Sequence, residues 1–164
     1  MIGWLHLTWG AARVALAATL ILSCGMEAAS AQDIALKSKR AEFASVKADL
    51  QDAIIEKGLV VDTTGQIGRM LTRTGPDLGS AKAIYKEAEY MAFCSAKLSR
   101  AMMEADPANI GYCPYVVFYY ERADEPGVVY VGYRPPELRG SDASRKALQE
   151  ISRLLEDIVT SALK

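Results

Sequence analysis

The fold is decided by the stretch YVVFYYERADEPGVVYVGY, which runs from Tyr115 to Tyr133. Its two ends, residues 115–120 and 128–133, are almost entirely β-branched or aromatic, a composition that favours strands. Between them, residues 123–127 combine Asp, Glu, Pro and Gly, which are typical of a turn. The stretch therefore predicts an antiparallel hairpin.

Upstream, residues 83–93 predict another strand. In that strand an expected buried face alternates with a partly wet one, Ala88, Tyr90 and Ala92 against Glu87, Glu89 and Met91. Ser95 can then cap a short helix that ends at Ala105, before the breaker Asp106-Pro107.

Two longer helices flank this region. Residues 37–57 predict a helix that Gly58 ends, with one apolar face made of Phe43, Val46, Leu50 and Ile54. Ser141 can cap a last helix, whose apolar face is Leu148, Ile151, Leu154, Leu155, Ile158 and Val159. The pattern predicts an α+β fold, an antiparallel sheet packed with helices.

The links between these elements are less clear. Residues 59–61 predict a short strand, residues 62–65 a turn and residues 67–71 one or two helical turns. The segment after Gln32 is either unordered or an edge strand, because Ile34 and Leu36 alternate only weakly.

The first residues are typical of a secretion signal. An uncharged apolar run covers residues 14–24, too short for a membrane span of about 20 residues, and Ala29-Ser30-Ala31 offers a cleavage site. Two alternatives remain, a lipoprotein with Cys24 as its lipidated first residue and an uncleaved anchor. We therefore expect a signal peptide over 1–31, a domain over 32–136 and a helix over 137–164 that packs on it, in a periplasmic or secreted protein.

Cleavage would remove His6, the only histidine of the chain. Catalytic triads, histidine-rich zinc sites and histidine-ligated haem are therefore not expected, and no cofactor or catalytic residue is assigned. The net charge of −1 and the absence of basic runs argue against nucleic acid and against a membrane surface as partners.

Several short motifs follow one another in a characteristic order. They are Lys57-Gly58-Leu59, EYMAFCSA from Glu89 to Ala96, Asp106-Pro107, Tyr112-Cys113-Pro114-Tyr115 and Val128-Val129-Tyr130-Val131. Together they resemble the bacterial family filed as domain of unknown function 302, over about residues 43–136. The resemblance implies a compact α+β domain of TATA-binding-protein-like architecture, without implying DNA binding. It carries over no catalytic residue, and Cys113 precedes Pro114 where the commoner pattern has leucine, proline and then cysteine.

Cys94 and Cys113 form the only cysteine pair after cleavage. In an oxidising compartment a structural disulfide is expected, worth roughly 3 kcal/mol by loop closure. A reactive thiol pair for redox chemistry is an alternative, since Cys94 would precede a helix start. A soft copper site made of Cys94, Cys113 and Met102 is another, although methionine at helical spacing usually fills a core.

All eight tyrosines lie between Tyr85 and Tyr133. They either build an ordinary sheet core and rim or expose an aromatic surface for a ligand, a partner protein or a second copy of the chain. The candidate binding surface is Tyr90, Tyr115, Tyr119, Tyr130 and Tyr133. We therefore expect an exported, non-catalytic binding or accessory module of unknown ligand. The alternative is a protein that handles thiols or copper.

Overall fold

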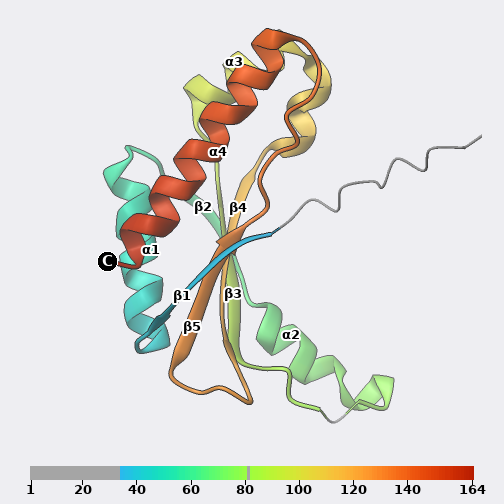
Figure 1. Cartoon of the computed structure of the whole chain (residues 1–164). Coiled ribbons are helices and arrows are strands. Elements are labelled where there is room, and N and C mark those ends of the chain that lie inside the picture. Colours follow the sequence, from blue (N-terminus) through green and yellow to red (C-terminus); the bar gives the residue numbers. More distant parts are fainter. Residues whose placement is uncertain (1–33, 81) are drawn as a thin grey trace, which may run out of the picture.

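The computed structural model describes residues 34–80 and 82–164 of the chain, so the expected leader with His6 and Cys24 lies outside the described residues. The elements follow in the order β1 Ala35–Arg40, α1 Phe43–Glu56, β2 Val61–Gly65, α2 Ile67–Thr74, η1 Pro76–Leu78, β3 Tyr85–Phe93, α3 Ala96–Ala105, η2 Pro107–Tyr112, β4 Tyr115–Arg122, β5 Val128–Tyr133 and α4 Asp142–Ala162, η marking 3₁₀ turns (Figure 1).

One five-stranded sheet has the order β1-β5-β4-β3-β2, and every neighbouring pair is antiparallel. The predicted hairpin forms its centre, with Val117 opposite Tyr133 and Glu121 opposite Val129. The α+β fold class is therefore confirmed.

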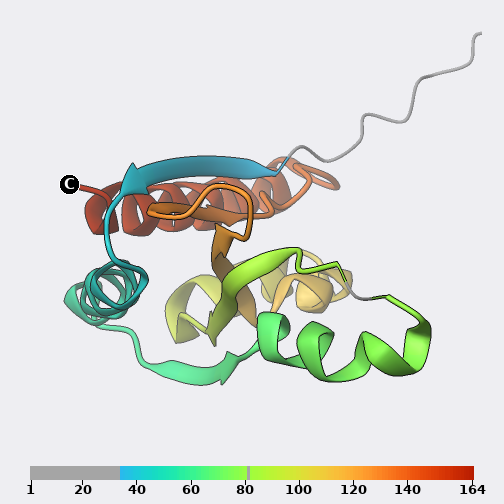
Figure 2. The same ribbon diagram turned by 90° about the horizontal axis from the view of Figure 1, so that it is seen from below.

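The helices cover the two faces of the sheet unequally. Helices α1 and α4 lie on one face, whereas α2 lies on the other, as the two views agree (Figures 1 and 2). On that second face α2 packs on β3, where Gly68 lies against Ala88. None of the helices between residues 34 and 164 combines the length and the apolar content that a bilayer crossing needs.

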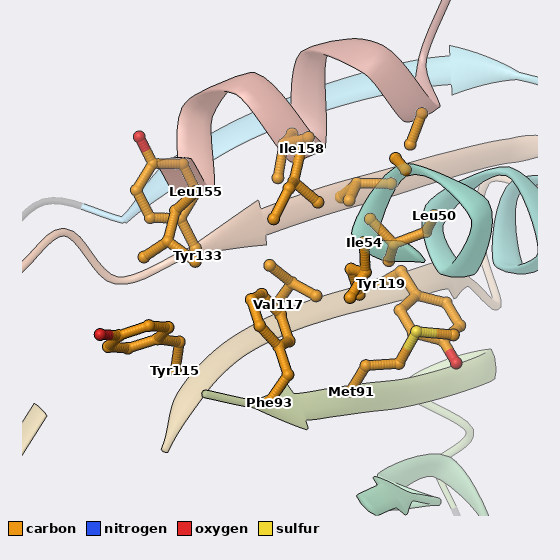
Figure 3. Close-up of a cluster of buried hydrophobic side chains, with 14 of the residues drawn as sticks. Leu50, Ile54, Met91, Phe93, Tyr115, Val117, Tyr119, Tyr133, Leu155 and Ile158 are labelled. Carbon is orange, nitrogen blue, oxygen red and sulfur yellow. The ribbon is translucent and has the colours of Figure 1, made fainter. Parts of the chain in front are cut away.

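The hydrophobic core lies between α1, α4 and the covered face of the sheet (Figure 3). Its largest fully buried side chains are Tyr119, Phe93, Leu50, Ile54, Met91, Met102, Leu148, Ile151 and Ile158. Most of the predicted apolar helix positions are thus in the core. The predicted caps are confirmed too, because Ser95 and Ser141 accept hydrogen bonds from Leu98 and Ser144 amides, and Gly58 has φ 73°.

The predicted helix over 37–57 is wrong at its start. Residues Ala35–Arg40 form edge strand β1, which pairs along its whole length with β5, and α1 begins only at Phe43. The pairing stabilises an extended backbone there, and Lys37 bonds to Glu156 and Thr160 on α4. Of the two readings for the segment before it, the edge strand is correct.

Two further predictions around β2 and β3 are wrong. The expected turn over 62–65 is strand β2, because Thr63, Thr64 and Gly65 pair with β3. On β3 the face expected to be partly wet points into the core, since Glu89 is 8% and Met91 1% exposed. The residues of the opposite face are covered by α2 instead, as Ala88 shows.

Candidate functional site

The two cysteines lie together at one end of the sheet. Phe93, the last residue of β3, pairs with Tyr115, the first of β4, so the adjacent Cys94 and Cys113 become neighbours. They are 2.6 Å apart, and no disulfide bond is assigned between them. The fold therefore brings together the two cysteines that the sequence analysis treats as a pair.

The surroundings of the pair do not favour a reactive thiolate. Burial, followed by a hydrogen bond with Cys113, raises the pKa of Cys94 to about 11. Burial likewise raises the pKa of Tyr115 to about 12. Ser99 joins this group, its Oγ 2.9 Å from the Tyr115 hydroxyl and 3.8 Å from the Cys113 sulfur. A thiol with a raised pKa is protonated at neutral pH and is a poor nucleophile.

The copper alternative combines Cys94 and Cys113 with Met102. In the described part of the chain, no three His, Cys, Asp or Glu side chains are grouped to hold a metal ion. Met102, the thioether of the copper alternative, is a fully buried core side chain.

Three of the five tyrosines predicted to form a binding surface face the interior. Tyr115, Tyr119 and Tyr133 are at most 4% exposed and lie among the core side chains (Figure 3). Their hydroxyls bond to polar groups at the core margin, Tyr119 to Glu89 at 2.8 Å and Tyr133 to Glu156 at 3.2 Å. The prediction that these three tyrosines belong to an exposed surface is therefore wrong. Both faces of β4 are aromatic, so the sequence could not indicate which one the helices cover.

A second aromatic group lies on the opposite face. There Tyr120 stacks on Tyr130 with ring centroids 5.1 Å apart and an interplanar angle of 11°. Tyr85 meets Tyr120 edge-on at 5.3 Å, and Phe118 extends the row at 6.4 Å. Of the predicted surface, only Tyr90 and Tyr130 are on this side. Phe118, Tyr120 and Tyr85 are not among the predicted site residues, although the alternation of side chains along a strand places the first two on one face of β4.

Three of these rings, those of Tyr85, Phe118 and Tyr120, border a hollow of about 540 Å³, the open-face groove. Its walls come from β1, α2 and the central strands, namely Ile34, Leu36, Ile67, Tyr85, Ala88, Glu89, Phe118, Tyr119, Tyr120 and Arg134. The Glu89 carboxylate is not free to serve it, because it binds Lys47 at 2.6 Å and the Tyr119 hydroxyl. The lining is therefore mainly apolar and aromatic.

Two glycines on this face leave space that neighbouring backbone and aromatic side chains occupy. A Cβ on Gly132 would come within 2.4 Å of the Ala35 carbonyl oxygen and 2.8 Å of the Phe118 ring. A Cβ on Gly65 would lie 2.0 Å from the Tyr90 ring. Gly132 pairs with Leu36 and with Phe118 across the sheet, so the groove floor depends on the absence of its side chain.

Charge in the groove is concentrated at one end. Arg134 follows β5, is exposed, and makes neither an ion pair nor a hydrogen bond with any residue that the structure describes. Arg122, on β4 opposite Tyr85, is by contrast neutralised by Asp124, at 2.8 Å. Arg134 is therefore the cation of the groove lining that remains available to a ligand.

Comparison with solved structures shows a likeness in fold. A crystal structure of an uncharacterized conserved protein DUF302 from Bacillus stearothermophilus superposes with a TM-score of 0.66, at 11% sequence identity. The match covers 80% of this chain and 98% of that chain. At this identity the likeness shows the fold alone.

Sequence comparison adds the family. No curated protein matches the chain. The family model described as "Domain of unknown function DUF302" matches residues 34–163, a range that includes helix α4 as well as the sheet. A match over most of the chain decides membership, and the protein belongs to the DUF302 family.

Proposed function

We propose that this protein is an exported, non-catalytic binding module that holds an apolar ligand in the open-face groove. The groove is the observation that carries the proposal. Small-molecule sites are usually concave, mostly apolar hollows of roughly 300–1,000 Å³ with few polar groups, and the groove of about 540 Å³ falls within this range.

The aromatic rings are suited to such a role. Burial raises the pKa of Tyr120, and Tyr130, which stacks on Tyr120 beside the groove, has its hydroxyl bound to Glu125 at 2.6 Å. The rings therefore offer apolar area while their hydroxyl groups are occupied or sheltered. Ile34 and Leu36, 54% and 44% exposed, add accessible apolar surface to the groove wall.

The cysteine pair supports this module structurally in our proposal. A bond between Cys94 and Cys113 would join the ends of β3 and β4 and fix α3 and η2 between them. The raised pKa of Cys94 favours this role over that of a nucleophile, because the thiolate fraction at neutral pH is small.

Binding can be tested with N-phenyl-1-naphthylamine, a neutral probe that fluoresces in apolar surroundings. We expect saturable binding at one site, weakened at least tenfold by Leu36→Lys, which places a charge on the groove wall. Val60→Lys is the matched control, because Val60 is 73% exposed and does not line the groove. Absence of saturable binding, or equal loss in both variants, would contradict the proposal.

Export is tested separately, by the mass of the protein recovered from the cell envelope. A chain that starts at Gln32 supports it, and a lipid-modified chain that starts at Cys24 supports export with an anchor. An intact leader on a protein found in the cell interior would refute it.

A further inference from the structure

We propose that the ligand of the open-face groove is an elongated hydrocarbon with one carboxylate, held with that carboxylate at Arg134. This inference rests on the proposed binding function and names its ligand class. It follows from the extent of the groove along the strands, from its lining, and from the position of Arg134, the one available cation among the described residues that line it.

The residues that line the groove are spread along the length of the strands. Tyr85, at one end, is opposite Arg122 at the last position of β4, whereas Arg134 follows Tyr133, which is opposite Val117 near the start of β4. At about 3.3 Å per strand residue, the two ends are separated by roughly 15–20 Å. A hydrocarbon chain matches this shape, and a compact ring system would leave half of the groove empty.

Between these ends the lining offers contacts to hydrocarbon. The walls are Ile67 of α2 on one side and, on the other, Leu36 of β1 with Ile34 just before that strand; Phe118 and Tyr120 form the floor. The carboxylate of Glu89 is directed to the opposite face, where it binds Lys47 and Tyr119. An uncharged chain fits this middle part, and a second charged group would be desolvated there without a partner.

The charge at one end selects the head group. A guanidinium binds a carboxylate through two parallel hydrogen bonds, which also fixes its orientation. Arg134 has no partner among residues 34–80 and 82–164, so its donors are free to bind such a group. A neutral head would leave this cation unmatched, and a cationic head would be repelled.

The test uses three ligands with the same chain and different heads: dodecanoate, dodecanol and dodecyltrimethylammonium. Each displaces N-phenyl-1-naphthylamine from the full chain, at concentrations below micelle formation. We expect dodecanoate to bind at least tenfold more tightly than dodecanol, and the ammonium compound to bind most weakly. Arg134→Gln should reduce the affinity for dodecanoate to that for dodecanol. It should leave the affinity for dodecanol unchanged.

Two further variants check the reasoning. Arg134→Lys should retain part of the preference, because the charge stays and the paired donors are lost. Arg153→Gln is the matched control, an exposed arginine on α4 that does not line the groove, and it should change nothing. Circular dichroism verifies that each variant is folded.

The outcomes separate this inference from the function on which it rests. If the naphthylamine probe binds but dodecanol and dodecanoate have equal affinities, the binding function stands and the carboxylate assignment is overturned. If the probe does not bind, both are overturned. Binding only to anionic phospholipid vesicles would show that a membrane occupies this face instead. A dimer that dissociates in the Leu36→Lys variant but not on addition of dodecanoate would show that a second copy of the chain occupies it.

Discussion

Breaking the proposed bond between Cys94 and Cys113 should destabilise the protein by an amount that depends on the length of the loop it closes. The bond would close a loop of about 20 residues, for which loop-closure entropy predicts about 3 kcal/mol. The unfolding entropy is about 2.1 cal/mol/K per residue. Over the described residues, 3 kcal/mol therefore corresponds to a fall in Tm of about 10 °C.

The assay compares thermal unfolding of the oxidised chain with and without a thiol reductant, after mass spectrometry has established that the bond has formed. The Cys94→Ala, Cys113→Ala double variant is the control and should not respond to the reductant. Comparison of the reduced wild type with this variant separates the loss of packing from the loss of the cross-link.

The reasoning is refuted if the bond forms and the oxidised and reduced chains unfold at the same temperature. It is also refuted if the exported chain keeps two free thiols under oxidising conditions. In the reduced chain, the alkylation rate of Cys94 should keep rising as the pH approaches its pKa of about 11, rather than level off near 9.

Three further results are expected. Gly132→Ala should destabilise the chain by about 1–3 kcal/mol through its clash with the β1 backbone, measured by urea unfolding, whereas Gly111→Ala, which meets nothing within 4 Å, should not. The pKa of Glu121 is lowered, chiefly by a hydrogen bond from the Gly127 amide. Its contribution to the free energy of unfolding is therefore complete above the unfolded pKa of about 4.5 and is lost as the pH falls through the lower folded pKa. Glu121→Gln should flatten the acid limb of a curve of stability against pH. Tyr119→Phe should cost about 1–3 kcal/mol by removing a hydrogen bond to a buried carboxylate, with unchanged secondary structure by circular dichroism.

The parts of the fold that the sequence predicts correctly are those in which local pattern and tertiary packing agree. Residues 128–133 are β-branched or aromatic and become a central strand with the predicted bounds. Ser95 and Ser141 cap the helices that follow them, because capping is a local interaction. For residues 37–40 of edge strand β1 the sequence pattern predicts a helix. The prediction fails because the strand is stabilised by pairing with β5, which lies far along the chain.

The candidate site was predictable in its composition but not in its position. The sequence shows that the strands carry many tyrosines, and alternation sorts them into two faces. It does not show that α1 and α4 cover the face of Tyr119 and leave that of Tyr120 open. The groove also includes Ile34 and Arg134, which come together only when β1 joins the sheet beside β5.

The position of β1 has a consequence for how the chain reaches its final form. Strand β1 is the first described element, yet its only partner in the sheet is β5, the last strand. The growing polypeptide cannot complete this pairing until residues 128–133 have been synthesised, so the groove wall made by Ile34 and Leu36 forms late. Such a high sequence separation slows folding, which is compatible with the proposed export, because a chain that folds slowly can still be translocated in an unfolded state.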